Sequence, residues 1–212
     1  ETSDGKHIYL YLHKGSSVIM REIGRLREIA FRAVGEGTLQ RRDIDRYDNH
    51  YYHLILWDDK DLEIVGAYRF GDAQRLSQPD HQTGLYSATL FEYAKDNPAL
   101  FEEGLELGRS FVQPRYWGKR SLDYLWFGIG AFLTRYQHYR YLFGPVSLSN
   151  SYPQPAKQLI VQFYQTYFPA RFGEAKAKIP FTVPSDSLKA FSGNDYKKEF
   201  TQLKHLLANM GV

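Results

Sequence analysis

A basic loop between an expected strand and an expected helix carries the clearest chemical signal in the sequence. Residues 104–112 read as a strand, residues 114–120 as a loop, and Ser121 is placed to cap a helix over 122–136. The loop cations are Arg115, Lys119 and Arg120. The first N–H groups of a helix are unpaired and partially positive, so they attract phosphate. The spacing predicts a phosphate-binding turn, although a plain strand–helix connection with solvated cations has the same pattern.

Acidic side chains at two places could take a proton from a nucleophile or hold a cationic one. Glu106 lies in the expected strand over 104–112, and Asp45 and Asp48 lie in the charged stretch 40–50. A carboxylate can act as a general base toward an ammonium group, directly or through water. Each has a structural alternative, which is a salt bridge for Glu106 and an Asx-type turn for the two aspartates.

The composition excludes several other chemistries. The 212 residues contain no cysteine, so disulfides, thiolate nucleophiles and cysteine-based zinc sites are excluded. The seven histidines show no metal-ligand spacing, and we expect no metal site. The longest apolar run, residues 122–133, is shorter than the roughly 20 residues that span a bilayer. A net charge of +3 does not by itself indicate nucleic-acid binding, and none is expected.

Strand and helix patterns alternate along the chain. Strands are predicted over residues 7–13, 51–57, 62–70, 86–91, 104–112 and 140–148, with a hairpin turn at 58–61. Helical spacing predicts helices over residues 18–34, 122–136, 155–168 and 195–208. This alternation predicts an α/β domain with a largely continuous sheet. We expect the domain to occupy residues 1–175, followed by a C-terminal extension over 176–212.

The basic loop and the strand before it resemble a known superfold. Arg115-Tyr-Trp-Gly118-Lys-Arg120 resembles the acyl-carrier-binding loop of the GCN5-related N-acetyltransferases (GNAT), with Arg120 where glycine or alanine is usual. Glu106-Leu-Gly-Arg109 resembles the Glu-x-x-Arg strand shared by acyl-homoserine-lactone synthases and ornithine N-acyltransferases. The resemblance implies an α/β, GNAT-like fold with a mixed, splayed central sheet flanked by helices.

Further motifs, in order over about residues 20–170, narrow the resemblance to the ornithine-lipid and glycine-lipid N-acyltransferases, also labelled hemolysin-like. They are Leu26-Arg27 with Phe31, Asp45-Arg-Tyr-Asp48, Gly66 to Arg69, and Tyr141 to Ser147. The tryptophan that lactone synthases carry after the first helix is missing, because Gly-Glu-Gly occupies residues 35–37. Some members are fused to an O-acyltransferase domain, so we expect a chain without an initiator Met to be part of a longer protein.

The resemblance implies an enzyme that moves a 3-hydroxy fatty acyl group to the α-amino group of an amino acid such as ornithine or glycine. Acyl carrier protein is the expected donor and partner rather than coenzyme A, because Arg120 departs from the pattern that holds a pyrophosphate. No permanently bound cofactor is expected. The lyso-aminolipid product implies a cytoplasmic protein with peripheral contact to the inner membrane. The alternatives are an acyl-homoserine-lactone-like synthase and a non-catalytic module that binds acyl carrier protein or lipid.

The resemblance also assigns roles to residues. Glu106 is the expected base, and Tyr164, or Tyr167 in its place, the proton donor to the leaving thiolate; core packing is the alternative for either tyrosine. The expected acceptor-binding residues are Asp45, Asp48, Arg69, Arg109 and Arg27. The expected acyl-carrier-binding residues are Phe111, Val112, Arg115, Gly118, Lys119, Arg120 and Ser121. A backbone N–H of residues 111–113 is expected to meet the oxyanion.

Two of these roles carry conditions. Arg69 is expected to bind the carboxylate of the acceptor, whereas Arg27 is expected to organise the acidic loop or else to be an ordinary helix-surface charge. Glu106 and Arg109 fall on opposite faces of a regular strand, because side chains alternate with a period of two, unless a bulge at Gly108 changes the register.

Overall fold

The chain divides into two compact units. The computed structural model describes residues 1–79, 81, 83–94, 98–169, 175–183 and 190–212. One unit comprises residues 1–89 and 96–146, and the other comprises residues 90–95 and 147–212. No helix in the described ranges is long and apolar enough to cross a membrane.

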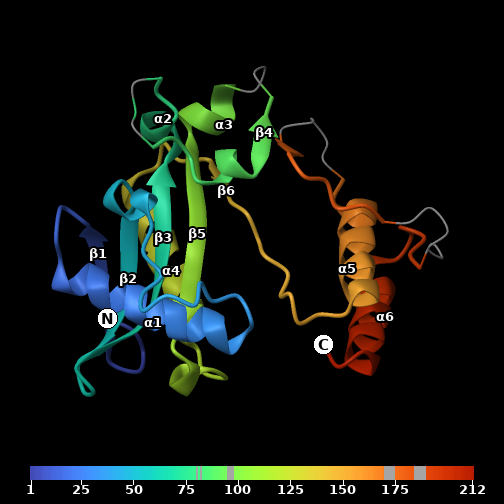
Figure 1. Ribbon diagram of the computed structural model, residues 1–212, viewed down its shortest axis with the longest axis horizontal. Helices are drawn as coiled ribbons and strands as arrows, with labels where there is room; N and C mark the ends of the chain where they lie inside the picture. Colours follow the sequence, from blue (N-terminus) through green and yellow to red (C-terminus); the bar gives the residue numbers. More distant parts are fainter. Residues whose placement is uncertain (80, 82, 95–97, 170–174, 184–189) are drawn as a thin grey trace. The chain divides into compact units, whose positions relative to one another are not determined.

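A five-stranded sheet forms the centre of the first unit, in the order β1-β2-β3-β5-β6 (Figure 1). Its strands are β1 (Lys6–Leu12), β2 (Tyr52–Asp58), β3 (Glu63–Asp72), β5 (Gly104–Val112) and β6 (Tyr141–Phe143). The first four strands pair antiparallel, and β5 pairs with β6 in parallel. The structure therefore confirms the predicted α/β class, the mixed sheet and the hairpin between β2 and β3.

Helices cover both faces of this sheet. Helix α1 (Val18–Ala33) lies across one face and α4 (Ser121–Arg135) across the other (Figure 1). The alternation of β2 explains why both are needed, because Ile55 is buried among the residues of α1 while Leu54 and Leu56 are buried among those of α4. Each such burial contributes about 1.5–3 kcal/mol.

The sheet opens between β5 and β6. Their pairing covers only Gly104–Glu106 on β5, opposite Tyr141–Phe143. Gly144 then packs so closely on the Leu107 carbonyl that any Cβ would collide with it. Along residues 108–112, β5 has no strand neighbour on this side in the described part of the chain. The splay that the GNAT resemblance implies is thus present.

A β-bulge interrupts β5 where it pairs with β3. Ala67 lies opposite Phe111 and Arg69 opposite Gly108, so β5 carries one extra residue in this interval. Arg109 takes the left-handed backbone conformation, with a φ of 50°, which costs about 1–2 kcal/mol for a residue with a Cβ. The sequence analysis left open a bulge at Gly108; in the structure the extra residue lies between Gly108 and Phe111.

Several short elements differ from the sequence prediction. The single strand expected over 86–91 is instead η2 (Ser87–Thr89) followed by β4 (Phe91–Tyr93). The remaining short elements are η1 (Arg46–Asn49), α2 (Ala73–Leu76), α3 (Pro98–Glu102) and η3 (Pro114–Tyr116). The prediction that Ser121 caps α4 is wrong, because Ser121 is the first residue of the helix and its side chain is buried. Arg120 occupies the cap position, without a side-chain capping bond.

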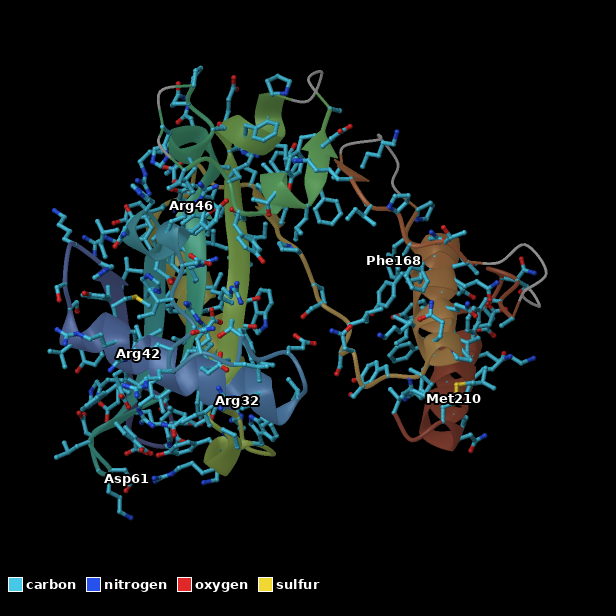
Figure 2. All side chains as sticks on the ribbon, in the orientation of Figure 1. Arg32, Arg42, Arg46, Asp61, Phe168 and Met210 are labelled. Carbon is cyan, nitrogen blue, oxygen red and sulfur yellow. The ribbon has the colours of Figure 1, made fainter. Side chains whose placement is uncertain are left out.

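The second unit is built around two helices. Its elements are α5 (Gln154–Tyr167), α6 (Tyr196–Asn209) and the pair of β4 with β7 (Ala175–Ala177). Phe163, Phe191 and Leu203 form its core, and the aromatic ring of Phe168 (labelled in Figure 2) lies at the end of α5. The unit boundary at residues 146/147 differs from the expected boundary at 175, because α5 packs on α6 through this core.

Candidate active site

Arg27 joins α1 to the acidic loop before β2. Its side chain is only 1% exposed. Nε donates to the Asp43 carbonyl at 3.0 Å, while Nη1 and Nη2 donate to the two carboxylate oxygens of Asp48 at 3.1 and 2.8 Å. A bidentate pair of this kind fixes orientation as well as charge. Arg27 is therefore a buried organiser of the loop, one of its two predicted roles, and not a surface charge.

Arg69 reaches the same carboxylates from β3. Nη1 donates to Asp45 Oδ1 at 2.7 Å and to Asp48 Oδ1 at 3.0 Å. The rings of Tyr51 and Tyr86 flank the guanidinium at 5.1 and 5.4 Å from their centroids. Arg69 is 2% exposed. This burial favours support of the two aspartates over direct contact with a ligand carboxylate.

Arg27, Asp43, Asp45, Asp48, Arg69 and Arg109 form one cluster of paired charges. Within this cluster Asp48 is held as an anion. Burial acts to raise the pKa of Asp48, but the charges and hydrogen bonds of Arg27 and the charge of Arg69 outweigh it and hold that pKa well below its usual range. His53 lies beneath, where its Nε2 donates to the Asp48 carbonyl at 3.0 Å. Burial lowers the pKa of His53 to about 4, so the ring is neutral at pH 7.

One carboxylate oxygen of Asp45 accepts hydrogen bonds from the backbone, and the other accepts none from the described residues. Oδ1 caps η1 by accepting the N–H groups of Tyr47 at 2.9 Å and Asp48 at 3.2 Å, so the predicted turn-capping alternative holds for this atom. Oδ2 is buried and accepts no hydrogen bond from the described residues. Its nearest charge is Arg109 Nη2, at 3.6 Å. A buried acceptor without a donor is costly and marks a place where a ligand can bind.

Arg109 provides the matching open donor. Its Nη1 donates to Asp43 Oδ2 at 3.0 Å, but its Nε is buried and donates to no described residue. The Arg109 and Asp45 side chains are 22% and 23% exposed, more than any other member of the cluster. Arg109 and Asp45 therefore each bring one buried polar atom without a hydrogen-bond partner in the described residues to the more exposed edge of the cluster.

Asp43 belongs to this cluster although the sequence analysis did not select it. It is 3% exposed and pairs with Arg27 at 3.2 Å and Arg109 at 3.0 Å. Its carboxylate holds the strained bulge residue against the loop. The signal was present in the sequence, where three aspartates fall within the six residues Asp43–Asp48.

Glu106 is a buried carboxylate that accepts three hydrogen bonds. It is 2% exposed. Oε2 accepts the Tyr51 hydroxyl and the Tyr86 N–H at 3.2 Å, and Oε1 accepts the Ser87 N–H at 2.6 Å. Burial and the Glu106 carboxylate raise the pKa of Tyr51, so this hydroxyl stays protonated as a donor. The geometry makes Glu106 an anchor for residues 86–87; its role as base stays a prediction.

A cavity of about 450 Å³ lies against β5 beyond the bulge. The end of α1 forms one wall, β5 the second, and the loop before α4 the third. Its lining includes five of the predicted acyl-carrier-binding residues: Phe111, Val112, Gly118, Lys119 and Ser121. Most of the exposed lining is apolar. Trp117 and Leu122 also line the cavity, near the start of α4. Glu106 does not line it.

The cations of the loop before α4 differ in whether a carboxylate already pairs with them. Arg115 pairs with Asp61 at 2.5 Å, in the β2–β3 turn labelled in Figure 2, and with Glu63 at 3.1 Å. Arg120 lies 3.8 Å from Asp123. Lys119 has no carboxylate partner within the described ranges, and its ammonium lies 4.9 Å from the Tyr116 ring centroid. Lys119 is thus the cation best placed to meet a phosphate at the cavity.

Gly118 allows the loop to turn toward α4. Its φ is +74°, a conformation that residues with a Cβ rarely adopt. The N–H of Gln113 donates to the Val65 carbonyl at 2.9 Å, which removes it from the three predicted oxyanion donors. Phe111 and Val112 keep that prediction.

Tyr164 lies in the second unit, on α5, and is 53% exposed. Its ring contacts Phe163 and Phe168. Tyr167 donates to Glu199 Oε2 at 2.6 Å, and burial together with this carboxylate raises the pKa of Tyr167 to about 12. Tyr167 therefore has a structural partner, whereas the role of Tyr164 stays a prediction.

Known proteins show similarity over most of the chain. A family model described as an acetyltransferase (GNAT) domain matches residues 26–127. A glycine N(alpha)-acyltransferase of Phocaeicola vulgatus is 31% identical over 222 residues, covering 96% of this chain and 67% of that protein. Another from Bacteroides thetaiotaomicron is 36% identical over 180 residues, covering 76% and 51%. An L-ornithine N(alpha)-acyltransferase of Brucella abortus is 29% identical over 175 residues, covering 68% and 60%. No solved structure was found to match.

The splayed mixed sheet and the matching domain model define a GNAT-fold protein. Within that fold, the chain belongs to the family of glycine and ornithine N-acyltransferases. It spans between about half and two thirds of the length of these curated relatives.

Proposed function

We propose that the protein is an N-acyltransferase that moves a fatty acyl group from a thioester donor to the α-amino group of a small amino acid. The observation that carries this proposal is the adjacency of an apolar cavity and the Asp45–Arg109 ion pair, each member of which keeps one polar atom without a hydrogen-bond partner in the described residues. Phe31 links the two, because it lines the cavity and its ring centroid lies 5.9 Å from the Arg109 guanidinium. Ser110, which follows Arg109 in the chain, also lines the cavity.

The Asp45–Arg109 ion pair matches the head of an amino acid. An α-amino acid carries an ammonium group and a carboxylate a few ångströms apart, which complement the free Asp45 Oδ2 and the free Arg109 Nε. Arg109 replaces Arg69 in the predicted role of binding the acceptor carboxylate, since it is the more exposed of the two. The names of the curated relatives support glycine or ornithine as the acceptor.

The cavity suits the donor. Apolar walls of this extent accept an acyl chain and the pantetheine arm that carries it. Lys119 and the free N–H groups at the start of α4 supply a site for one phosphodiester. Arg115 is neutralised by Asp61 and Glu63, which supports a donor with a single phosphate, acyl carrier protein, over one with a pyrophosphate.

In the reaction, the neutral amine attacks the thioester carbonyl and a C–N bond forms. The C–S bond then breaks, and the thiolate takes up a proton as the amine loses one. A carboxylate that orients the amine and a fixed guanidinium that holds the acceptor contribute by proximity. Glu106 as the base, acting through water, and Tyr164 as the proton donor to the thiolate are the remaining proposed roles.

The test is product formation by the purified chain. It is incubated with a 3-hydroxyacyl thioester of acyl carrier protein and either glycine or ornithine, and N-acyl products are identified by mass spectrometry. Asp45→Asn and Arg109→Gln are expected to raise the KM for the amino acid at least about tenfold, because each loses a charged hydrogen bond worth about 1.5–3 kcal/mol. The KM for the acyl donor should change little.

Arg46→Gln is the matched control, because its side chain is exposed and, among the described residues, contacts Tyr47 through a hydrogen bond to the hydroxyl at 3.0 Å and through its ring at 5.0 Å. A product formed from S-adenosylmethionine, or tight binding of the donor with no transfer to any amine, would overturn the proposal. The proposal would also be overturned if the KM for the amino acid were unchanged in both the Asp45→Asn and the Arg109→Gln variants.

A further inference from the structure

The outward face of α4 is apolar and uncovered in its own unit. Leu122, Trp126 and Phe127 are 49%, 46% and 57% exposed, and Gly130 and Ala131 continue the same face. The opposite face of α4 is buried in the core against β2 and β3. A helix that is apolar on both sides is unusual at a surface in water and indicates something that covers it.

Basic side chains stand at both ends of this face. Lys119 precedes the helix and Arg135 ends it, and the helix of 15 residues is about 22 Å long. Neither cation has a carboxylate partner within the described ranges; the Arg135 guanidinium lies 5.9 Å from the Tyr136 ring centroid. The one acid on the face, Asp123, lies beside Arg120. An apolar strip with cations at its ends complements an anionic, lipid-covered surface.

The face is continuous with the cavity. Leu122 belongs to both, since it lines the cavity and begins the exposed strip, and Trp117 also lines the cavity, with 47% exposure. An acyl chain held in the cavity can therefore leave along Leu122 toward Trp126 without crossing a polar surface. Tryptophan and tyrosine prefer the interface between lipid and water, which Trp126 and Tyr136 would occupy.

We infer that the outward face of α4 is a membrane-docking surface, with Leu122, Trp126 and Phe127 inserted among the lipids of an anionic bilayer and Lys119 and Arg135 at the head groups. This inference deepens the proposed function, because it gives a lipid product a route from the cavity into the membrane. It does not depend on the identity of the acceptor.

Co-sedimentation with large unilamellar vesicles tests it. The chain is expected to bind vesicles of equal parts phosphatidylglycerol and phosphatidylcholine, and to bind pure phosphatidylcholine more weakly, with an affinity that falls as salt rises. The double variant Trp126→Ser/Phe127→Ser should lose at least about tenfold in affinity for the anionic vesicles. Arg135→Gln should lose a smaller factor, and only on anionic vesicles.

The matched control is Ile19→Ser/Ile29→Ser on α1, because those side chains are 45% and 43% exposed on the other face of the sheet. It should bind vesicles as the unchanged chain does. A second readout needs no polar substitution. Lipids brominated on their acyl chains should quench the tryptophan fluorescence of the unchanged chain, and Trp126→Phe should reduce that quenching while its thermal melt stays unchanged.

Acyl transfer from a donor in free solution is measured in parallel, so that failure of docking and failure of the proposed function are separate results. The membrane inference is overturned if the unchanged chain does not bind anionic vesicles, or if the Trp126→Ser/Phe127→Ser variant binds them as well as the unchanged chain does. It is also overturned if the unchanged chain forms a dimer that this variant abolishes, because the face would then join two copies.

Discussion

Replacing Glu106 by glutamine separates an anchor from a catalytic base. The carboxylate accepts three hydrogen bonds, from the Tyr51 hydroxyl and the N–H groups of Tyr86 and Ser87. A carboxamide has one acceptor oxygen. If that oxygen stays on the Ser87 N–H, the amide nitrogen faces Tyr51, and the hydroxyl proton of Tyr51 loses its acceptor inside the core.

The size of the effect follows from these bonds. One buried donor left without a partner costs about 1–3 kcal/mol, and the loss of a charged acceptor for the Ser87 N–H costs about 1 kcal/mol more. The Tyr86 N–H loses little, because it also donates to the Tyr51 oxygen at 2.8 Å. The sum is about 2–4 kcal/mol, which corresponds to a fall of roughly 6–12 °C in the melting temperature of the first unit.

The assay combines a thermal melt with steady-state kinetics, and Glu103→Gln is the control. The Glu103 side chain is 42% exposed and lies 3.7 Å from Arg140, so its substitution should cost no more than about 0.5 kcal/mol. For Glu106→Gln we expect the lower melting temperature and a higher KM for the amino acid, because residues 86–87 carry the ring that flanks Arg109, with centroid and guanidinium 5.4 Å apart.

The kinetic result decides the second role. An anchor that is also the base loses kcat even at saturating amino acid and at a temperature well below the melt. An anchor alone recovers kcat there. If Glu106→Gln melts as the unchanged chain does, the reasoning from the three hydrogen bonds is refuted, whatever happens to the rate.

Two more outcomes are expected. Lys119→Gln should raise the KM for the acyl carrier protein donor about fivefold and leave the KM for the amino acid unchanged, which initial-rate measurements check; equal effects on both substrates would contradict the donor assignment. His53 has a folded pKa of about 4 against about 6.5 unfolded, so the unfolded chain binds the proton more readily and stability falls as pH drops from about 6.5 to 4. Chemical denaturation at several pH values should show this slope reduced in His53→Gln, and an unchanged slope would assign the pH dependence to other groups.

The regular elements of the first unit follow from its sequence pattern. The β-rich run of residues 52–58 predicts a strand and the helical spacing in 18–33 predicts an amphipathic helix, and both elements lie within one or two residues of their predicted ends. The family motifs were equally readable, because they are short stretches of sequence. These two kinds of signal need no knowledge of which residues meet in space.

Burial of charge could not be predicted in the same way. Arg27 and Glu28 are consecutive polar residues of α1, and helical periodicity treats them as a solvated face. In the structure both are buried, since Arg27 meets Asp48 and Glu28 accepts from the N–H groups of Thr38 and Leu39. Burial acts to raise the pKa of Glu28, but the Thr38 and Arg32 hydrogen bonds outweigh it and lower that pKa to about 2. Such pairing depends on how a loop folds back, which no local pattern encodes.

The extra residue in β5 is what brings the two halves of the site to one side of the sheet. Before the bulge, Leu105 and Leu107 belong to the core under α4, so the intervening Glu106 faces the side of α1. In a regular strand, residues 109 and 111 would share the face of Leu105 and Leu107. Phe111 instead packs in the core under α1, which shows that the face has switched between Leu107 and Phe111.

Arg109, inside the bulge, can therefore pair with Asp43 and stand beside Asp45 while Phe111 lines the cavity. The strain of its left-handed conformation, about 1–2 kcal/mol, is offset by that buried ion pair. A strand without the bulge would keep the same residues and the same sheet, yet it would place Arg109 among the apolar side chains under α4. Arg109 would then point away from Asp43 and Asp45, and the proposed acceptor site would lose its guanidinium.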